Sequence, residues 1–316
     1  MAAIGKVAVL GAGLVGRGWA IVFARAGSPV ALYDGDAAAL ARALELIDGS
    51  LGDLAAYRLI DEPPSAIRAR IVPVADLAAA VDGAVYVQEN VNESLELKRS
   101  IFAKLDPLTS SEAILASSTS TIPASAFTRE LKGRHRCLVA HPVNPPYLVP
   151  LVELAPAPWT DEAVVQKARA LHEAVGQVPI VVHREIQGFI LNRLQGALLA
   201  EAFRLIEDGY VGADDIDKTV SDGLGLRWSF MGPMETIDLN APGGVRDYVE
   251  RYGPLFYEMA KSQADPRRWS SALVDRIEKE RRAKLAVDRL GERQAWRDRR
   301  LMALLAHKRE AAKSTR

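Results

Sequence analysis

The sequence predicts an α/β protein: a Rossmann-type doubly wound sheet followed by an all-helical second domain. Short apolar runs, typical of buried parallel strands, alternate with helical segments up to about residue 184. A glycine-rich turn follows the first of these runs directly. After Gly188 the apolar residues keep helical spacing, and no further strand pattern occurs.

The chain opens with a strand, a turn, a helix and a second strand. Val7–Leu10 is an apolar run that ends at Gly11. Residues 14–26 carry large apolar side chains at three- and four-residue steps, which predicts a helix packed on a sheet. Gly27 ends this helix, and Val30–Tyr33 is the second strand.

The glycines of this opening predict a dinucleotide site. Gly11 makes the tight turn, Gly13 lets the backbone approach a pyrophosphate at the positive end of the helix, and Gly16 allows close packing. Asp34 follows Gly11 by 23 residues, where a carboxylate holds the ribose hydroxyls. No Arg or Lys occurs at 35–37, which favours NAD over NADP. A glycine turn without a ligand is the remaining alternative.

The rest of the first domain continues the alternation. We expect helices at 37–60, 77–81, 95–105, 124–131 and 162–175, and strands at 71–74, 84–89, 113–116, 136–140, 149–154 and 178–183. Asn92 is the expected N-cap of the helix at 95–105.

The second domain is expected to be helical throughout. A helix at 189–208 ends at Gly209, and another covers 214–221. We therefore divide the chain into an NAD-binding domain at 1–186 and a helical substrate and dimerisation domain at 187–316. Residues 276–313 hold 13 basic and 6 acidic residues with sparse apolar positions. They predict a long surface helix packed along one stripe, with anion or partner binding as the alternative.

Composition narrows the class of protein. The charges of the 40 basic and 40 acidic residues cancel, so the net charge does not indicate binding to nucleic acid or to a membrane surface. Cys137 is the only cysteine, which excludes an intrachain disulfide and a cysteine metal cluster; no metal is expected. Neither a signal peptide nor an apolar run of about 18 residues is visible. A cytoplasmic protein is the expectation.

Three polar clusters fall at the carboxyl ends of predicted strands, at residues 88–90, at 117–121 and at His141. Ligands of open α/β sheets bind outside the carboxyl ends of the strands, so these clusters should converge on the nicotinamide end of the crevice. Oxidation of an alcohol by hydride transfer needs a base, and histidine has a suitable pKa. Glu153 lies in an otherwise apolar strand and needs a partner, for which His141 is the obvious candidate because a Pro-rich turn joins the strands. A structural histidine is the alternative.

Two further polar features are candidates. Asn192 lies inside a predicted helix, where asparagine is mildly unfavourable, which indicates that its side-chain amide has a functional hydrogen-bonding role. A hydroxyl in the run from Ser117 to Thr121, which includes Ser120, can hydrogen-bond a substrate oxygen. The alternatives are a structural asparagine and an ordinary turn.

These motifs together resemble the 3-hydroxyacyl-CoA dehydrogenase superfamily. The resemblance runs from about Val7 to Gly253, and its motifs lie at residues 9–16, 117–120, 141–145, 151–153 and 188–193. The amino-acid sequence at 140–147, 223–227 and 232–236 is more similar to the branch of lambda-crystallin and L-gulonate 3-dehydrogenase.

The resemblance implies a Rossmann domain that binds NAD, and a helical domain through which two copies form a homodimer. It implies that His141 is the catalytic base, that Glu153 is its partner, and that Ser120 and Asn192 bind the substrate. The residues matching its cofactor contacts, besides the three glycines, are Leu14, Val15, Asp34, Glu93, Lys98 and Asn144. A substrate carboxylate needs a cation, for which Arg227 is our candidate.

The expected activity is NAD-dependent oxidation of the 3-hydroxyl of a small hydroxy acid, as in L-gulonate 3-dehydrogenase. Acyl-CoA members carry aromatics after the histidine, whereas Pro142 and Val143 stand here, which favours a small hydroxy acid. A 3-hydroxyacyl-CoA dehydrogenase and a carnitine 3-dehydrogenase are alternatives. A third alternative, from a different class, is a non-catalytic NAD-binding or crystallin-like structural protein.

Overall fold

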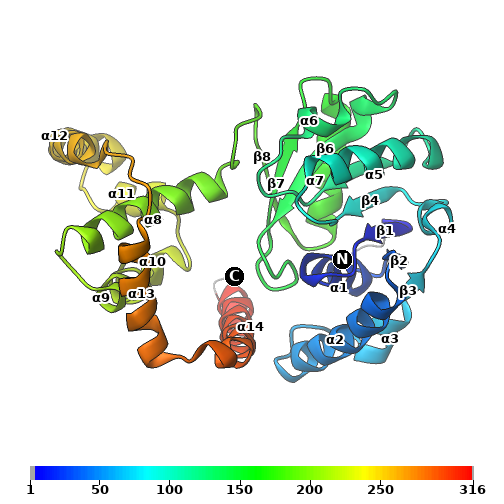
Figure 1. Ribbon diagram of the computed structural model, residues 1–316, viewed down its shortest axis with the longest axis horizontal. Helices are drawn as coiled ribbons and strands as arrows, with labels where there is room; N and C mark the ends of the chain where they lie inside the picture. The colour runs from blue at the N-terminus through cyan, green and yellow to red at the C-terminus, as the bar shows by residue number, and fades with distance from the viewer. Residues whose placement is uncertain (1–3, 315–316) are drawn as a thin grey trace. The chain divides into compact units, whose positions relative to one another are not determined.

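The computed structural model describes residues 4–314, and its contacts divide them into two compact units (Figure 1). The first unit joins the described residues up to Arg193 with those from Ala295 onward. The second unit is Leu194–Gln294. The first contains the sheet, and the second is helical.

The described part of the first unit contains one sheet of eight strands in the order β3-β2-β1-β4-β5-β6-β7-β8. All neighbouring strands are parallel except β6 and β7, which run antiparallel. The strands are β1 (Val7–Leu10), β2 (Val30–Tyr33), β3 (Ile71–Val74), β4 (Tyr86–Glu89), β5 (Ile114–Ser117), β6 (Cys137–Pro142), β7 (Leu151–Pro156) and β8 (Val178–Val181).

Helices cover both faces of this sheet, which confirms the doubly wound fold. They are α1 (Leu14–Arg25), α2 (Ala37–Ala56), α3 (Pro64–Ala69), α4 (Leu77–Val81), α5 (Leu95–Leu108), α6 (Ala124–Thr128) and α7 (Glu162–Ala174). One core cluster joins α1, α2, α3 and α7 to the sheet, and a second joins α4, α5 and α6. Alternate residues of β1 enter opposite clusters, because successive side chains of a strand point to opposite faces.

Several predicted boundaries differ from the structure by a few residues, and three of the differences concern the site or its supports. The N-cap of α5 is Ser94, whose hydroxyl accepts from the Leu97 amide, so the prediction of Asn92 was wrong. Helix α2 ends at Ala56, short of the predicted residue 60. Strand β6 continues through His141 to Pro142, because the antiparallel pairing with β7 extends that far.

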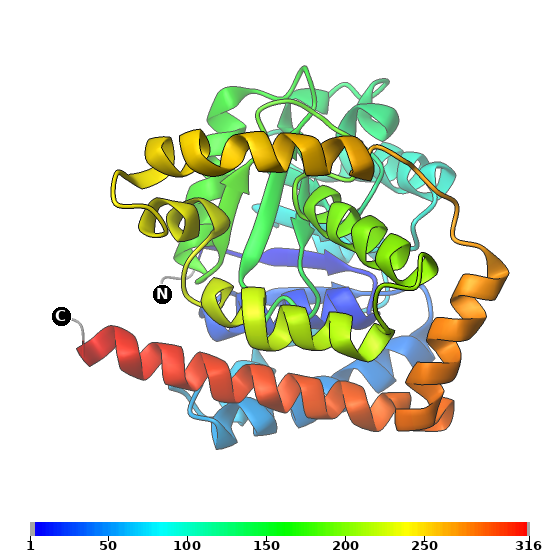
Figure 2. The same ribbon diagram turned by 90° about the vertical axis from the view of Figure 1, so that its left-hand side faces the viewer.

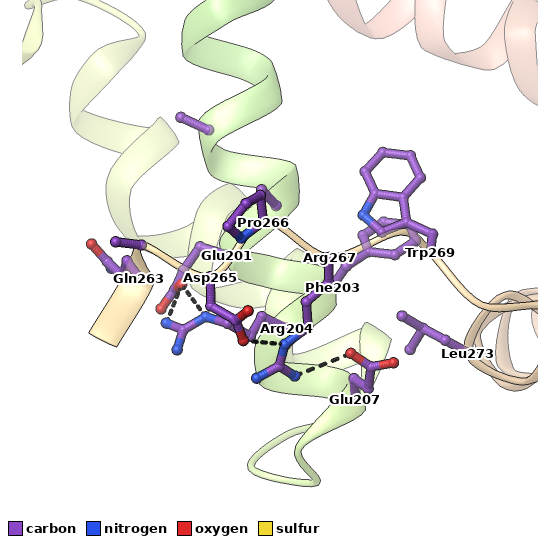
Figure 3. A pocket seen from close by; sticks show the side chains of 13 residues that line it. Glu201, Phe203, Arg204, Glu207, Gln263, Asp265, Pro266, Arg267, Trp269 and Leu273 are labelled. Carbon is purple, nitrogen blue, oxygen red and sulfur yellow. Dashed lines mark hydrogen bonds and ion pairs between the residues drawn. The ribbon is translucent and has the colours of Figure 1, made fainter. Parts of the chain in front are cut away.

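The second unit consists of helices, and no strand occurs among its residues 194–294. Its helices are α8 (which begins in the first unit; Leu191–Glu207), α9 (Ala213–Lys218), α10 (Gly225–Trp228), α11 (Pro233–Leu239), α12 (Gly244–Gln263) and α13 (Ser271–Lys284). A π-helical turn at Thr219–Leu224 joins α9 to α10. A cavity of about 410 Å³ lies within this unit, and Arg204 and Arg267 on its wall are ion-paired with Glu201 and Glu207 (Figure 3).

The C-terminal segment is not the single surface helix that we predicted. Helix α13 ends at Lys284, a short 3-10 turn follows, and α14 (Leu290–Ser314) is a separate helix, the long red one in Figure 2. Met302 is only 1% exposed and belongs to the core of the first unit. The last residues therefore group with the first unit, unlike the predicted division at 1–186 and 187–316. Among residues 4–314, no helix is both long and apolar enough to cross a membrane.

Candidate active site

The turn after β1 has the shape of a dinucleotide-binding turn. Gly11 has φ +91°, and a Cβ there would lie 2.7 Å from the Asn90 carbonyl oxygen. A Cβ on Gly16 would lie 1.8 Å from the Gly11 carbonyl oxygen, so helix and turn touch as predicted. Around Gly13 a Cβ would meet nothing within 4 Å, which leaves space for a phosphate at the N-terminus of α1. These residues fit NAD.

Asp34 lies on the wall of a crevice of about 370 Å³ that also contains this turn. Its Oδ2 accepts from the Ala12 amide at 2.8 Å, which ties the carboxylate to the glycine turn. The same wall holds Arg17 and Arg42, two cations that lie outside residues 35–37. They come from α1 and α2, so only the folded structure shows that they share a wall with Asp34.

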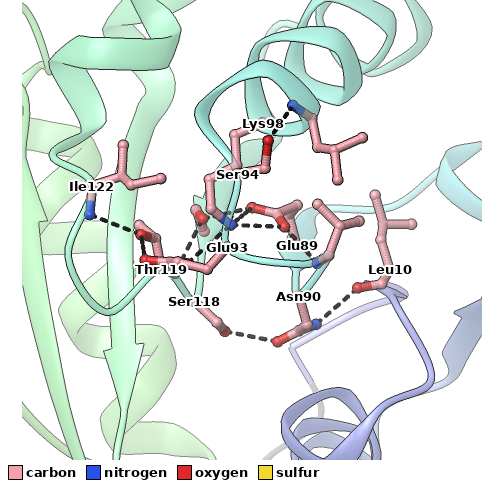
Figure 4. Close-up of polar contacts among 12 residues, drawn as sticks. Leu10, Glu89, Asn90, Glu93, Ser94, Lys98, Ser118, Thr119 and Ile122 are labelled. Atoms are coloured by element: carbon pink, nitrogen blue, oxygen red, sulfur yellow. Dashed lines mark hydrogen bonds and ion pairs between the residues drawn. The ribbon is translucent and has the colours of Figure 1, made fainter.

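A partly buried polar network fixes the glycine turn from the side of the sheet (Figure 4). Ser118 Oγ donates to Asn90 Oδ1 at 2.7 Å, and Asn90 Nδ2 donates to the Leu10 carbonyl oxygen at 3.1 Å. Gln88 Nε2 donates to Ser118 Oγ at 2.7 Å and to the Ala140 carbonyl oxygen at 3.3 Å. The network therefore connects the turn after β1 with the strand that carries His141.

Glu93 and Lys98, predicted as cofactor contacts, are engaged with protein groups (Figure 4). Lys98 is 1% exposed, and its Nζ lies 3.1 Å from Glu89 and 3.8 Å from Glu93. Glu93 Oε1 accepts from the Thr119 and Thr121 hydroxyls at 2.6 and 3.0 Å. These contacts hold the loop after β5, and a contact of Glu93 or Lys98 with the cofactor stays a prediction.

The pKa of Glu93 reflects this loop. Burial of the carboxyl would raise its pKa, but hydrogen bonds from Thr119 and Thr121 and the nearby Lys98 ammonium together lower it below its ordinary value. Glu93 is therefore a carboxylate that accepts hydrogen bonds from the loop.

His141 and Glu153 lie directly opposite each other in the antiparallel pair of β6 and β7. His141 Nδ1 is 2.7 Å from Glu153 Oε2. The histidine is 5% exposed and the glutamate 0%. Opposite residues of an antiparallel pair lie on the same face of the sheet, so the hairpin itself brings the two side chains together.

Glu153 is held at both oxygens. Its Oε1 accepts from the amides of Ile190 and Leu191 at 2.8 and 2.9 Å, at the start of α8. Burial would raise the pKa of Glu153, but the hydrogen bonds from His141 and from these two amides outweigh burial and lower it. A carboxylate only accepts, so His141 donates through Nδ1, and Nε2 of the neutral ring is left to take a proton.

Ser120 and Asn192 come from distant parts of the sequence and meet in the structure. Asn192 Nδ2 donates to the Ser120 carbonyl oxygen at 2.9 Å. Among the residues described, the Ser120 hydroxyl has no hydrogen-bond partner, and Ser120 is exposed. The hydroxyl is therefore available to a ligand, as the predicted substrate contact requires.

The remaining predicted site residues are more exposed. Leu14, at the start of α1, is 52% exposed, and Val15 beside it is half-buried. Asn144 is exposed and precedes a cis peptide bond to Pro145. Arg227 is exposed on α10, in the second unit. The binding roles of these residues stay predictions.

Two family models match the chain in order. The NAD binding domain of 3-hydroxyacyl-CoA dehydrogenase matches residues 6–186, and the C-terminal domain of 3-hydroxyacyl-CoA dehydrogenase matches residues 188–287. Together they cover most of the sequence.

Individual relatives agree with these models. The chain is 42% identical to lambda-crystallin of Oryctolagus cuniculus over 98% of both chains. It is 37% identical to an L-carnitine dehydrogenase of Streptomyces griseus over 79% of this chain and 74% of that one.

A solved structure extends the likeness to three dimensions. It is that of 5-formyl-3-hydroxy-2-methylpyridine 4-carboxylic acid 5-dehydrogenase, described as an NAD+ dependent dismutase. The TM-score is 0.82 at 28% identity, covering 96% of this chain and 97% of that one. The chain therefore belongs to the 3-hydroxyacyl-CoA dehydrogenase family and is an NAD-dependent oxidoreductase that acts on a CH–OH group.

Proposed function

We propose that this protein oxidises the 3-hydroxyl of a small hydroxy acid, as L-gulonate 3-dehydrogenase does. The observation that carries the proposal is the contact of 2.7 Å between His141 and Glu153, at the carboxyl-terminal end of β6, which lies beside β5 and parallel to it. Ligands of such sheets bind at this edge.

In the proposed reaction His141 is the general base. When bound, NAD supplies the hydride acceptor. His141 Nε2 takes the hydroxyl proton, and Glu153, fixed by the amides of Ile190 and Leu191, stabilises the imidazolium that forms. The burial of both side chains strengthens this interaction, because water screens it little.

Ser120 and Asn192 are proposed to orient the substrate. The Ser120 hydroxyl is free to donate to the reacting oxygen, and the hydrogen bond from Asn192 to the Ser120 carbonyl oxygen restrains that part of the loop. Positioning of this kind lowers the entropic part of the barrier.

The proposed substrate class rests on two observations. The similarity to lambda-crystallin extends over nearly the whole chain. Pro142 and Val143 follow the histidine, where acyl-CoA members of the family carry aromatics. We propose Arg227 as the cation that holds the substrate carboxylate.

Replacement of the base tests the chemistry. For His141→Asn we expect turnover with NAD and L-gulonate to fall by about 10²–10⁴-fold. Isothermal titration with NADH should give nearly unchanged affinity, because the adenosine end of the crevice is built from other residues. His135→Asn, at an exposed histidine, is the matched control. Retained turnover in His141→Asn would remove the proposed base.

The second candidate substrate is L-carnitine, which the likeness to an L-carnitine dehydrogenase favours. A comparison of kcat/KM for L-gulonate, L-carnitine and 3-hydroxybutyryl-CoA at saturating NAD separates these activities. We expect L-gulonate to be the best of the three. NAD reduction with none of a panel of 3-hydroxy acids would instead favour the non-catalytic, crystallin-like role.

We also propose that the protein is a cytoplasmic homodimer associated through its helical domain. The support is a series of apolar side chains on α12 that are at least 41% exposed, namely Val245, Val249, Tyr252, Leu255, Phe256, Tyr257 and Met259. Exposed apolar surface of this extent marks an interaction site. The free cysteine, Cys137, is consistent with a reducing compartment.

A further inference from the structure

Arginines on the cavity walls differ in whether a carboxylate neutralises them. In the cavity of the second unit, Arg267 pairs with Glu207 and Asp265 (Figure 3). It also pairs with Asp208. In the cofactor crevice, the exposed Arg42 lies 3.8 Å from Asp36. Arg17 lines the same crevice, yet within residues 4–314 its guanidinium makes no ion pair and donates no hydrogen bond.

Arg17 is the fourth residue of α1, and its amide donates to the Gly13 carbonyl oxygen at 2.9 Å. Its side chain is half-buried, and this burial lowers the pKa of the guanidinium, while the neighbouring Tyr147 has the opposite effect. A partly desolvated cation without a carboxylate is stabilised when an anion enters the crevice. The open space at Gly13 on the same wall is where a phosphate is expected.

We propose that Arg17 is a cofactor-binding residue whose guanidinium holds the adenosine-side phosphate of the NAD pyrophosphate. The crevice wall runs from Gly13, at the N-terminus of α1, to Asp34, where the adenosine ribose is expected. Among residues 4–314, Arg17 lines that wall without an ion pair, and we assign it to the phosphate on the Asp34 side. The proposal rests on NAD binding in this crevice and not on the identity of the hydroxy acid.

Charge balance supports this assignment. A helix N-terminus provides the equivalent of about half a positive charge. The pyrophosphate of NAD carries two negative charges, so α1 alone leaves most of that charge unmatched. Arg17 adds one full positive charge, and its planar guanidinium can donate two parallel hydrogen bonds to phosphate oxygens.

Binding of cofactor fragments to the full-length protein tests the proposal without turnover. Adenosine, AMP and ADP-ribose are titrated as competitors of NADH, followed by NADH fluorescence. For Arg17→Gln we expect AMP and ADP-ribose to bind about 10–50-fold more weakly, the usual range for a charge-assisted hydrogen bond. Adenosine has no phosphate, so its affinity should change less than about twofold.

Two control variants and one conservative variant complete the test. Arg42→Gln removes a charge from the same wall. Because Arg42 is already near Asp36, the affinity for AMP should fall by less than about threefold. Arg169→Gln removes an exposed charge on α7 and should change nothing. Arg17→Lys keeps the charge and should recover part of the affinity for AMP.

The outcomes separate the alternatives. If Arg17→Gln lowered the affinities for adenosine and AMP equally, Arg17 would shape the adenine pocket. If the affinity for AMP were unchanged, Arg17 would contact no phosphate. If Arg42→Gln lost as much affinity for AMP as Arg17→Gln, the effect would come from the summed positive charge of the crevice wall and not from a contact of Arg17. Each of these results overturns the proposal. Thermal unfolding of each variant without ligand verifies that it is folded. Because no hydroxy acid is used, failure here is distinct from failure of the proposed reaction.

Discussion

At the scale of single residues, the site depends on which groups are already satisfied by the protein. Both oxygens of Glu153 are occupied, by His141 and by two backbone amides, whereas the Ser120 hydroxyl has no partner among the described residues. Lys98 is buried between two carboxylates. Buried charges persist only when they are paired, so these contacts indicate which side chains form the scaffold and which remain available to ligands.

The Glu153 carboxylate makes stability depend on pH. Its pKa in the folded protein lies below its ordinary value of 4.5, so its contribution is complete above about pH 4.5 and is lost as pH falls through the lower, folded-state pKa. As the pH is lowered from 6 to 3, the free energy of unfolding of Glu153→Gln, measured by urea denaturation, should fall less steeply than that of the wild-type protein. Glu173→Gln, at an exposed ion pair, should keep the wild-type slope. Identical slopes in all three proteins would contradict the assignment.

At the scale of elements, the hairpin of β6 and β7 and the helix α14 contribute most to the arrangement. The hairpin places His141 opposite Glu153 without help from distant parts of the chain. Helix α14 contributes Met302 to the core that α1 and α2 form with the sheet, and Leu301, Leu305 and Ala306 pack around it. The end of the chain thereby contributes to the stability of the dinucleotide-binding unit.

This packing predicts the effect of shortening one side chain of α14. Met302→Ala should lower the free energy of unfolding by about 2–4 kcal/mol, because it removes a buried side chain from a packed core. Leu304→Ala, at a position that is 40% exposed, should cost less than about 1 kcal/mol. Denaturant unfolding of both variants provides the measurement. Equal effects would show that α14 is not docked through Met302.

At the scale of the whole molecule, the second unit leaves apolar surface uncovered. Its small core consists of Ile206, Ala213 and Leu273 with a few partly buried neighbours, while the apolar residues of α12 are exposed. An amphipathic helix with an unburied apolar face gains stability when a second copy covers it.

Association through α12 is measurable. Sedimentation velocity at micromolar concentration should show a dimer, and Phe256→Asp should shift it toward monomer, because the change introduces a charge into apolar surface. Glu250→Gln, at an exposed polar position of the same helix, is the control and should remain dimeric. A wild-type monomer at these concentrations would overturn the homodimer proposal.

Much of the first unit was predictable because its signals are local. The first strand, the glycine turn, α1, the second strand and Asp34 lie within 28 residues, and each step follows from backbone sterics or helix periodicity. Glu153 stood out as a charge in an apolar strand, which implied a nearby partner. The cap of α5 was missed because Asn92 and Ser94 are both good caps, and only the backbone path selects one of them.

The sequence by itself determined the fold class, the cofactor turn and the identity of the residues with chemical potential, because periodicity and turn chemistry act over short stretches of chain. Only the tertiary structure decided that the amides of Ile190 and Leu191 hold Glu153, that Lys98 is buried, that Arg17 lines the crevice without a carboxylate partner among residues 4–314, and that α14 returns to the first unit. The contacts of Glu153 and of α14 join segments far apart in sequence. Like the burial of Lys98 and the surroundings of Arg17, they depend on burial and distance in the folded chain, which no local pattern records.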